Sequence, residues 1–186
     1  MKARTLAVDA GRWLTRHRQW GATSARVVLG GVWIYAGVSK ISDLPASVRA
    51  VEAYELLPLG LAEFVGAALP FVEITIGLFL IAGFATRLNA VVSTVLLTAF
   101  VIGIASAWAR GLRIDCGCFG GGGELGEGES PSYGVDLARD LGLLLLAGLL
   151  AWWPASRLSA DEWTAHLVTP APPRSRAGFV PASPRK

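Results

Sequence analysis

The chain has 186 residues, of which 53% are hydrophobic and 17% charged, and its mean hydropathy is +0.49. A soluble domain carries charge on about a quarter of its residues, whereas several segments of about twenty residues here carry almost none. The composition therefore excludes an ordinary water-soluble globule and predicts an integral membrane protein. The net charge of +3 does not indicate nucleic-acid binding, because the Lys and Arg residues flank apolar segments.

The first predicted span has a short uncharged stretch. It runs from Val27 to Ser39 and extends to Ile41 if the Lys40 ammonium reaches the interface. A cleaved signal peptide is the alternative, but no small-residue cleavage site follows the stretch. Before it, residues 1–23 form a basic segment, for which we expect either a solvated cytoplasmic tail or a short helix on the membrane surface.

The second predicted span, from about Leu59 to Gly83, contains Glu63 and Glu73. A short amphipathic helix on the membrane is expected before it, within residues 42–57. Glu73 lies roughly 20 Å below the start of the span and should therefore face the bundle. The two acids lie on distinct faces of the helix and do not make a paired-carboxylate site.

These two acids have two interpretations. As ion-pair partners they stabilise the bundle, and we expect Lys40 to pair with Glu63 near the outer surface. Alternatively, Glu73 belongs to a proton path or lies next to a bound quinone, which makes it the candidate cofactor-binding residue.

The third predicted span, Leu88 to Trp108, carries no charge, and the fourth runs from near Val135 to Trp153. Residues 109–135 between them are polar and glycine-rich, so we expect this loop to be exposed. Twelve Lys and Arg residues on one side of the spans oppose five on the other, which predicts cytoplasmic termini and an extracytoplasmic loop.

The expected organisation is thus an all-α, four-helix bundle in the cell membrane. It is a multi-pass protein in contact with lipid, with its membrane domain at residues 24–154. A Pro- and Arg-rich cytoplasmic tail follows at residues 155–186, and from Thr169 onward its composition is typical of disorder.

The loop holds the only cysteines, Cys116 and Cys118, separated by Gly117. Their sulfurs can form a disulfide only if the chain bends sharply, which Gly117 allows. So small a ring is strained, and strained disulfides are the more oxidising ones, so the pair is a candidate thiol–disulfide exchange site. Arg113 would favour the thiolate and Asp115 would oppose it, so no net pKa shift is expected.

Other roles for the cysteines stay open. They can form an inert structural disulfide, be lipid-modified, or be idle. A metal site is not expected, because tetrahedral zinc needs four ligands and both histidines, His17 and His166, are predicted on the other side. The glycine run at 120–123 has no Lys-Ser/Thr after it, so we interpret it as a hinge and not as a phosphate loop.

Several short motifs together resemble the MauE branch of the MauE/DoxX membrane proteins over about residues 24–153. The most specific is the Cys-Gly-Cys-Phe-Gly element after the third span. The matching pieces are Gly37-Val38-Ser39-Lys40, Tyr54-Glu55-Leu56-Leu57-Pro58, Pro70 with Glu73 and Gly77, and Cys116-Gly117-Cys118-Phe119-Gly120.

This resemblance implies redox chemistry. MauE-like proteins are linked to disulfide formation in secreted partners, alongside a thioredoxin-like protein, and DoxX-like relatives to quinone-dependent complexes. The arrangement is also similar to vitamin K epoxide reductase bundles. Those use C-x-x-C and a second cysteine pair, which this chain lacks, so a partner would have to supply the second dithiol.

Two functional hypotheses follow from these features. In the first, Cys116 and Cys118 are catalytic in a thiol–disulfide oxidoreductase that exchanges with an extracytoplasmic thioredoxin-like or secreted thiol protein and passes electrons to membrane quinone. In the second, the protein is a non-catalytic anchor or assembly subunit of a larger membrane complex, and its disulfide is structural. Redox cycling of the pair separates the two hypotheses.

Overall fold

The computed structural model describes the backbone of residues 2–119, 121–126 and 128–153, and the side chains of these residues from Trp20 onward. This part of the chain is mostly helical, as predicted. Its elements are α1 (Lys2–Ile41), α2 (Leu44–Glu52), α3 (Leu59–Ala82), α4 (Thr86–Ala109), β1 (Ile114–Asp115), β2 (Gly123–Glu124) and α5 (Tyr133–Trp152). The tail predicted at residues 155–186 lies outside the described residues.

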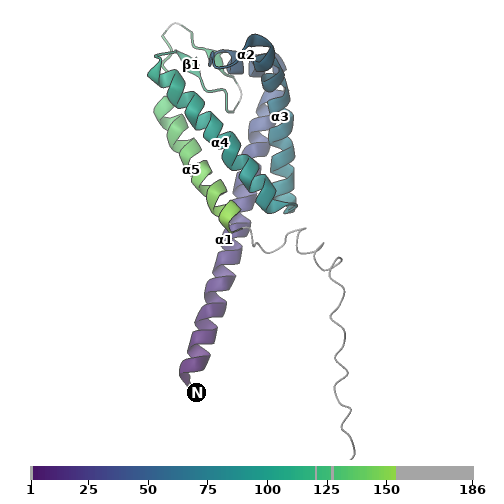
Figure 1. Cartoon of the computed structure of the whole chain (residues 1–186), viewed down its shortest axis with the longest axis vertical. Helices are drawn as coiled ribbons and strands as arrows, with labels where there is room; N and C mark the ends of the chain where they lie inside the picture. Colours follow the sequence, from purple (N-terminus) through teal and green to yellow (C-terminus); the bar gives the residue numbers. More distant parts are fainter. Residues whose placement is uncertain (1, 120, 127, 154–186) are drawn as a thin grey trace, which may run out of the picture.

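Four long helices pack as two antiparallel pairs, α1 with α3 and α4 with α5 (Figure 1). The first pair is close because small residues face each other. A Cβ added at Gly30 would lie 2.9 Å from the Gly77 carbonyl oxygen, and one added at Gly37 would lie 2.6 Å from that of Pro70. Larger side chains at these glycines would therefore push α1 and α3 apart.

Helix α2 crosses one end of the bundle, bent by 103° from α1 (Figure 1). Asp43 caps its start, since the Asp43 carboxylate accepts from the Ala46 N–H at 3.0 Å. Its inner side packs on α3, where the Ser47 hydroxyl donates to the Gly66 carbonyl at 2.8 Å. The predicted short helix is therefore present, and it covers the bundle end.

The loop after α4 folds back onto the same end. Strands β1 and β2 form a small antiparallel sheet, which the sequence did not indicate. Ile114 and Cys116 are buried against Ile104 and Tyr133, and the Ile114 N–H donates to the Tyr133 hydroxyl at 3.2 Å. The prediction that this loop is wholly exposed is therefore wrong, because its few apolar residues fill the space between α2, α4 and α5.

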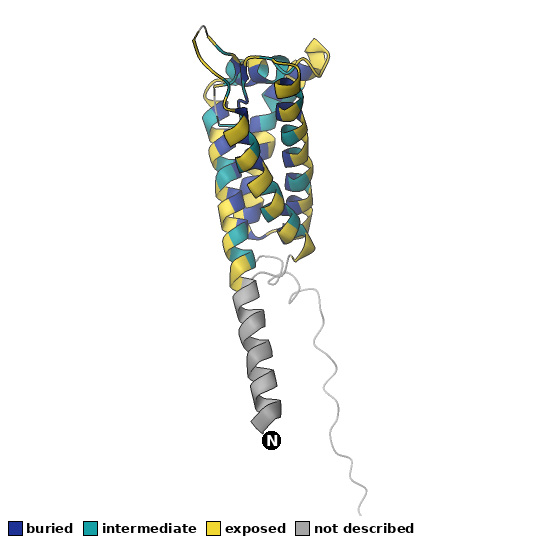
Figure 2. Cartoon of the chain, turned by 90° about the vertical axis from the view of Figure 1, so that its left-hand side faces the viewer, coloured by how far each residue is buried: buried dark blue, intermediate teal, exposed yellow. Residues whose placement is uncertain are grey.

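Helices α3 and α4 are each long and apolar enough to cross a membrane, and α1 from Trp20 together with α2 passes the same test as a bent pair. The outer faces of the bundle carry many exposed residues (Figure 2), among them large apolar ones such as Leu59, Phe64 and Leu145. Such a surface fits lipid contact.

Two other helices differ in detail from the predicted spans. Helix α5 occupies the place of the fourth span but has three charged residues in its first half, so a fourth span stays a prediction. Helix α1 begins at Lys2, well before the predicted first span.

Candidate cysteine site

Cys116 and Cys118 follow β1 and lie beneath α2 at the covered end of the bundle. Both are free thiols; Cys116 is buried and Cys118 half-buried. The expected bend is present, since Gly117 has a φ of +67° and the Cys118 N–H donates to the Cys116 sulfur at 3.4 Å. A Cβ at Gly117 would lie 2.7 Å from that of Ala50 in α2, so only glycine fits this turn.

The described glycines of the run, Gly121 to Gly123, lie against this turn. The ideal Cβ position of Gly122 lies 2.7 Å from the Gly117 Cα and 2.6 Å from the Ala50 Cβ. The backbone of Gly121, Gly122 and Gly123 has positive φ throughout, which other residues rarely adopt. The run therefore closes over the cysteine turn as a packed segment.

Arg139 is the cation at the cysteines, although the sequence pointed to Arg113. The Arg139 guanidinium donates to the Cys116 sulfur at 3.6 Å and its Cζ lies 4.6 Å from the centre of the Phe119 ring. Two carboxylates hold it, Asp140 at 2.9 Å and Asp136 at 3.0 Å. Arg113 instead donates to the Glu129 carbonyl at 2.5 Å.

The two thiols differ in acidity. The pKa of Cys116 is lowered, mainly by a hydrogen bond from the Cys118 side chain and further by the Cys118 backbone N–H and Arg139, against the opposing effect of burial. The pKa of Cys118 is raised, first by its hydrogen bond to Cys116 and then by burial. Cys116 is therefore the more acidic of the two thiols, a difference that the sequence did not indicate.

Cys118 has an acceptor of its own. Its sulfur lies 3.9 Å from the Asp140 Oδ2 atom, while Asp140 Oδ1 accepts from Arg139. One helix end, α5, thus supplies a cation to Cys116 and a carboxylate to Cys118. The spacing of Asp136, Arg139 and Asp140 was the signal available in the sequence, since residues three and four apart share a helix face.

Tyr54 holds the turn from the other side. Its hydroxyl donates to the Cys116 carbonyl at 3.0 Å, and burial raises the pKa of this phenol. It therefore stays neutral and serves as a hydrogen-bond donor. The sequence analysis noted this tyrosine only as part of a motif.

Lys40 pairs with Glu73, so the predicted pairing with Glu63 is wrong. The Lys40 Nζ lies 2.6 Å from the Glu73 Oε1, with 4% and 0% of the two side chains exposed. Glu63 is exposed. The helix face decides the pairing, because the buried side of α3 includes Ala62, Gly66, Pro70, Glu73 and Gly77, and Glu63 lies off that stripe.

Two small cavities flank Cys118. The first, of about 20 Å³, is lined by Cys118, Glu73 and Asp140 together with apolar residues that include Trp33 and Phe100. The second, of about 50 Å³, is lined by both cysteines, Lys40, Ser47 and Tyr54. The Lys40–Glu73 pair therefore faces the cysteines through these cavities.

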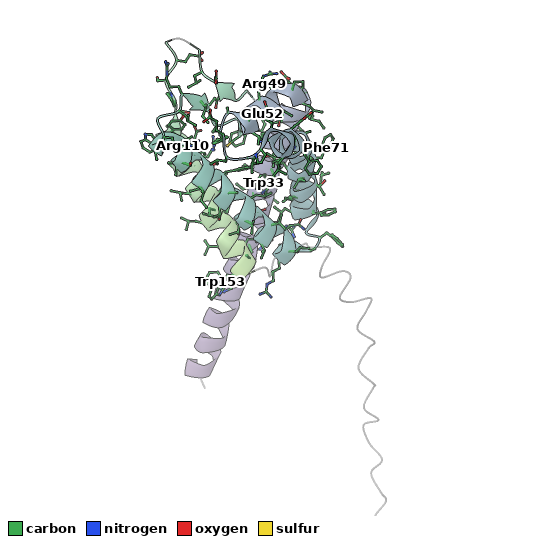
Figure 3. The ribbon with its side chains drawn as sticks, turned by 45° about the horizontal axis from the view of Figure 1, so that its top comes forward. Trp33, Arg49, Glu52, Phe71, Arg110 and Trp153 are labelled. Carbon is green, nitrogen blue, oxygen red and sulfur yellow. The ribbon has the colours of Figure 1, made fainter. Side chains whose placement is uncertain are left out.

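A larger cleft of about 620 Å³ lies on the outside, between α2 and the small sheet. Figure 3 shows Arg49, Glu52 and Arg110 gathered at this end of the molecule, far from Trp153. The cleft carries both signs of charge. Its charged lining residues are Arg49, Glu52, Glu55, Arg113 and Glu124.

A family model described as methylamine utilisation protein MauE matches residues 18–153. The chain belongs to the MauE family. The match covers most of the chain, including the helices, the cysteine turn and the Lys40–Glu73 pair, and confirms the resemblance drawn from the short motifs. No curated protein and no solved structure matches the chain with significance.

The quinone that the resemblance implies does not fit beside the cysteines of this MauE-family protein in the conformation described. The cavity between Cys118 and Glu73 is about 20 Å³, room for about one water molecule. Aromatic rings are present there, but a quinone ring is far larger than the space. Among the described residues, no group of three or more His, Cys, Asp and Glu is arranged to hold a metal ion.

Proposed function

We propose that this MauE-family membrane protein is a thiol–disulfide oxidoreductase. Cys116 and Cys118 cycle between dithiol and disulfide by exchange with an extracytoplasmic thioredoxin-like or secreted thiol protein. The observation that carries the proposal is the unequal pair: Cys116 next to Arg139, Cys118 next to Asp140. Exchange needs one sulfur that is stable as a thiolate and one whose proton can be removed. Helix α5 meets both needs, because Arg139 stabilises a Cys116 thiolate and Asp140 can accept the Cys118 proton.

The exchange proceeds in two steps. Cys118 gives its proton to Asp140 and attacks the partner's disulfide, which forms a mixed disulfide and releases one partner thiolate. The Cys116 thiolate then attacks the Cys118 sulfur, closes the protein disulfide and releases the second partner thiolate. Two electrons pass from the cysteines to the partner. One released partner thiolate takes up the Cys118 proton, and the other takes a proton from water. The reverse reaction uses the same steps, with direction set by the partner's potential.

The partner's docking place in this proposal is the outer cleft between α2 and the sheet, next to the cysteine turn. Its mixed charges suit a polar protein surface. We further propose four spans with both termini in the cytoplasm, which puts the cleft outside. A reporter fused after Lys186 should then report the cytoplasm and one inserted between Gly121 and Gly122 the extracytoplasmic side. Identical locations for both would contradict this topology.

Trapping of a partner tests the exchange. The variant Cys116→Ser lacks the sulfur that resolves the mixed disulfide, so it should capture the partner in a covalent complex that disappears on reduction. Cys118→Ser is the matched control and should capture nothing. Thiol labelling of the wild type in intact cells, with and without reductant, should show a pair that cycles.

The second function, a non-catalytic assembly subunit with a structural disulfide, is favoured by one observation: Cys116 is buried in a small core with Ile114 and Tyr133. It predicts that both single cysteine variants lose stability equally and that neither captures a specific partner. A wild-type pair that never reduces in cells, together with no trapped complex, would establish this function and exclude the exchange.

A further inference from the structure

Asp140, the acceptor for the Cys118 proton, is a buried carboxylate. Only 2% of this residue is exposed, and its other oxygen is held by Arg139. A proton that arrives there has little direct contact with solvent. The small cavity shared by Cys118, Asp140 and Glu73 is the internal space next to it.

Glu73 has an unused acceptor facing this interior. Its Oε1 atom binds Lys40, but its Oε2 atom, fully buried, has no hydrogen-bond partner among the described residues. Burying such an oxygen without a partner is costly. The adjoining cavity, at about 20 Å³, has the volume of one water and offers it three polar groups, and buried waters make two to four hydrogen bonds.

We propose that the buried Glu73–Lys40 ion pair is the internal proton-exchange site for the cysteines, linked to Cys118 and Asp140 by one ordered water. This rests on the proposed exchange function and deepens it. The raised pKa of Cys118 supports it independently, because a thiol that stays protonated needs a base within reach.

The transfer of the Cys118 proton is a proton-transfer step only, and the two electrons pass in the thiol–disulfide exchange itself. When Cys118 attacks the partner's disulfide, its proton passes to Asp140 and through the water to the Glu73 carboxylate. A second cavity of about 50 Å³, lined by Lys40 and Tyr54, lies beneath α2. In this proposal the proton leaves through it to reach the released partner thiolate. In the reverse reaction the same proton returns to Cys118.

Several other groups face Cys118 and its two cavities, so they also shape its titration. Helix α4 contributes only apolar residues, Leu97 and Phe100, to the lining of the first cavity. The titratable and charged neighbours are Lys40 on α1, Tyr54 after α2, Glu73 on α3, Cys116 beside the thiol, and Asp136, Arg139 and Asp140 on α5.

The test uses the full chain in lipid nanodiscs and 4,4′-dithiodipyridine, a small neutral disulfide, as the oxidant. Each pair of thiols that closes to a disulfide releases two thiopyridones, which are followed by absorbance. We expect Glu73→Gln to slow closure at neutral pH by about tenfold or more and to move its pH profile upward. Glu73→Asp, which keeps a carboxylate, should restore much of the rate. Glu63→Gln, the exposed acid on the same helix, is the matched control and should match the wild type.

Infrared difference spectra of the dithiol and disulfide forms supply a second readout. A carboxyl band that changes on oxidation in the wild type and in Glu63→Gln, but is absent in folded Glu73→Gln, would support the inference. If folded Glu73→Gln closes at the wild-type rate and keeps the band, the inference is overturned while the exchange function stands. If the wild-type pair itself does not close, the proposed function fails first.

Discussion

Two clusters of charge flank the cysteines, and they differ in their access to solvent. Lys40 and Glu73 are sealed between α1 and α3, with 4% and 0% of their side chains exposed. Arg139 lies at the end of α5 with 28% of its side chain exposed and two carboxylates around it. The first cluster is one cation for one anion in the interior. In the second cluster Asp136 and Asp140 are buried and only Arg139 is partly exposed, and its guanidinium contacts the Cys116 sulfur.

Burial decides how each cluster can act. A sealed pair has few partners and its members depend on each other, so removing one leaves an uncompensated charge. Arg139, the partly exposed member of the second cluster, is screened by solvent, so its ion pairs contribute less to stability than a sealed pair does. We therefore expect the interior pair to dominate stability and the second cluster to dominate the chemistry of Cys116.

The largest effect should come from Lys40→Met. This change leaves Glu73 as a buried acid without its cation. Breaking a buried ion pair in this way lowers the free energy of unfolding by about 3–5 kcal/mol. Unfolding in detergent, followed by helical circular dichroism, measures the loss. The double variant with Glu73→Met should recover most of the stability, because an apolar pair replaces the charged one, yet should still close its disulfide slowly. A single variant as stable as the wild type would show that the pair is not sealed.

Arg139→Met should act mainly on reactivity. Without the guanidinium the lowered pKa of Cys116 moves up, so less thiolate is present at any given pH, and the profile of disulfide closure shifts to higher pH. Stability should also fall, because Asp136 and Asp140 lose their partner. Arg139→Lys keeps the positive charge but lacks the several N–H donors of the guanidinium. Its pH profile of disulfide closure should lie between those of the wild type and Arg139→Met. An unshifted profile in Arg139→Met would contradict the assignment.

The smallest effect should come from Tyr54→Phe. This change removes one hydrogen bond, from the phenol to the Cys116 carbonyl, worth about 1 kcal/mol, and leaves the ring packing in place. Exposed Glu55, whose carboxylate lies 3.7 Å from Arg110, is the neighbouring control. Its replacement by Ala should change stability little. Equal losses in both variants would mean that Tyr54 does not hold the cysteine turn.

The bends and ends of the helices were predictable because they depend on local chemistry. The Asp43 cap and the turn at Gly117 follow from side-chain acceptors and glycine freedom that neighbouring residues carry themselves. The long uncharged stretches likewise predicted α3 and α4, which end within two residues of the expected bounds. The extension of α1 back to Lys2 was left open, because its charged, mixed sequence has no clear apolar stripe.

The sequence by itself determined that this is a helical membrane protein of the MauE family with a reactive-looking Cys-Gly-Cys turn, since hydropathy, spacing and short motifs are local properties. Only the tertiary structure decided which charges meet. Lys40 pairs with Glu73 and not Glu63, and Arg139 rather than Arg113 reaches Cys116. Both outcomes depend on which helix faces turn inward and on the close approach of α1 and α3 at their glycines, and these contacts join residues far apart in the chain, where periodicity alone carries no information.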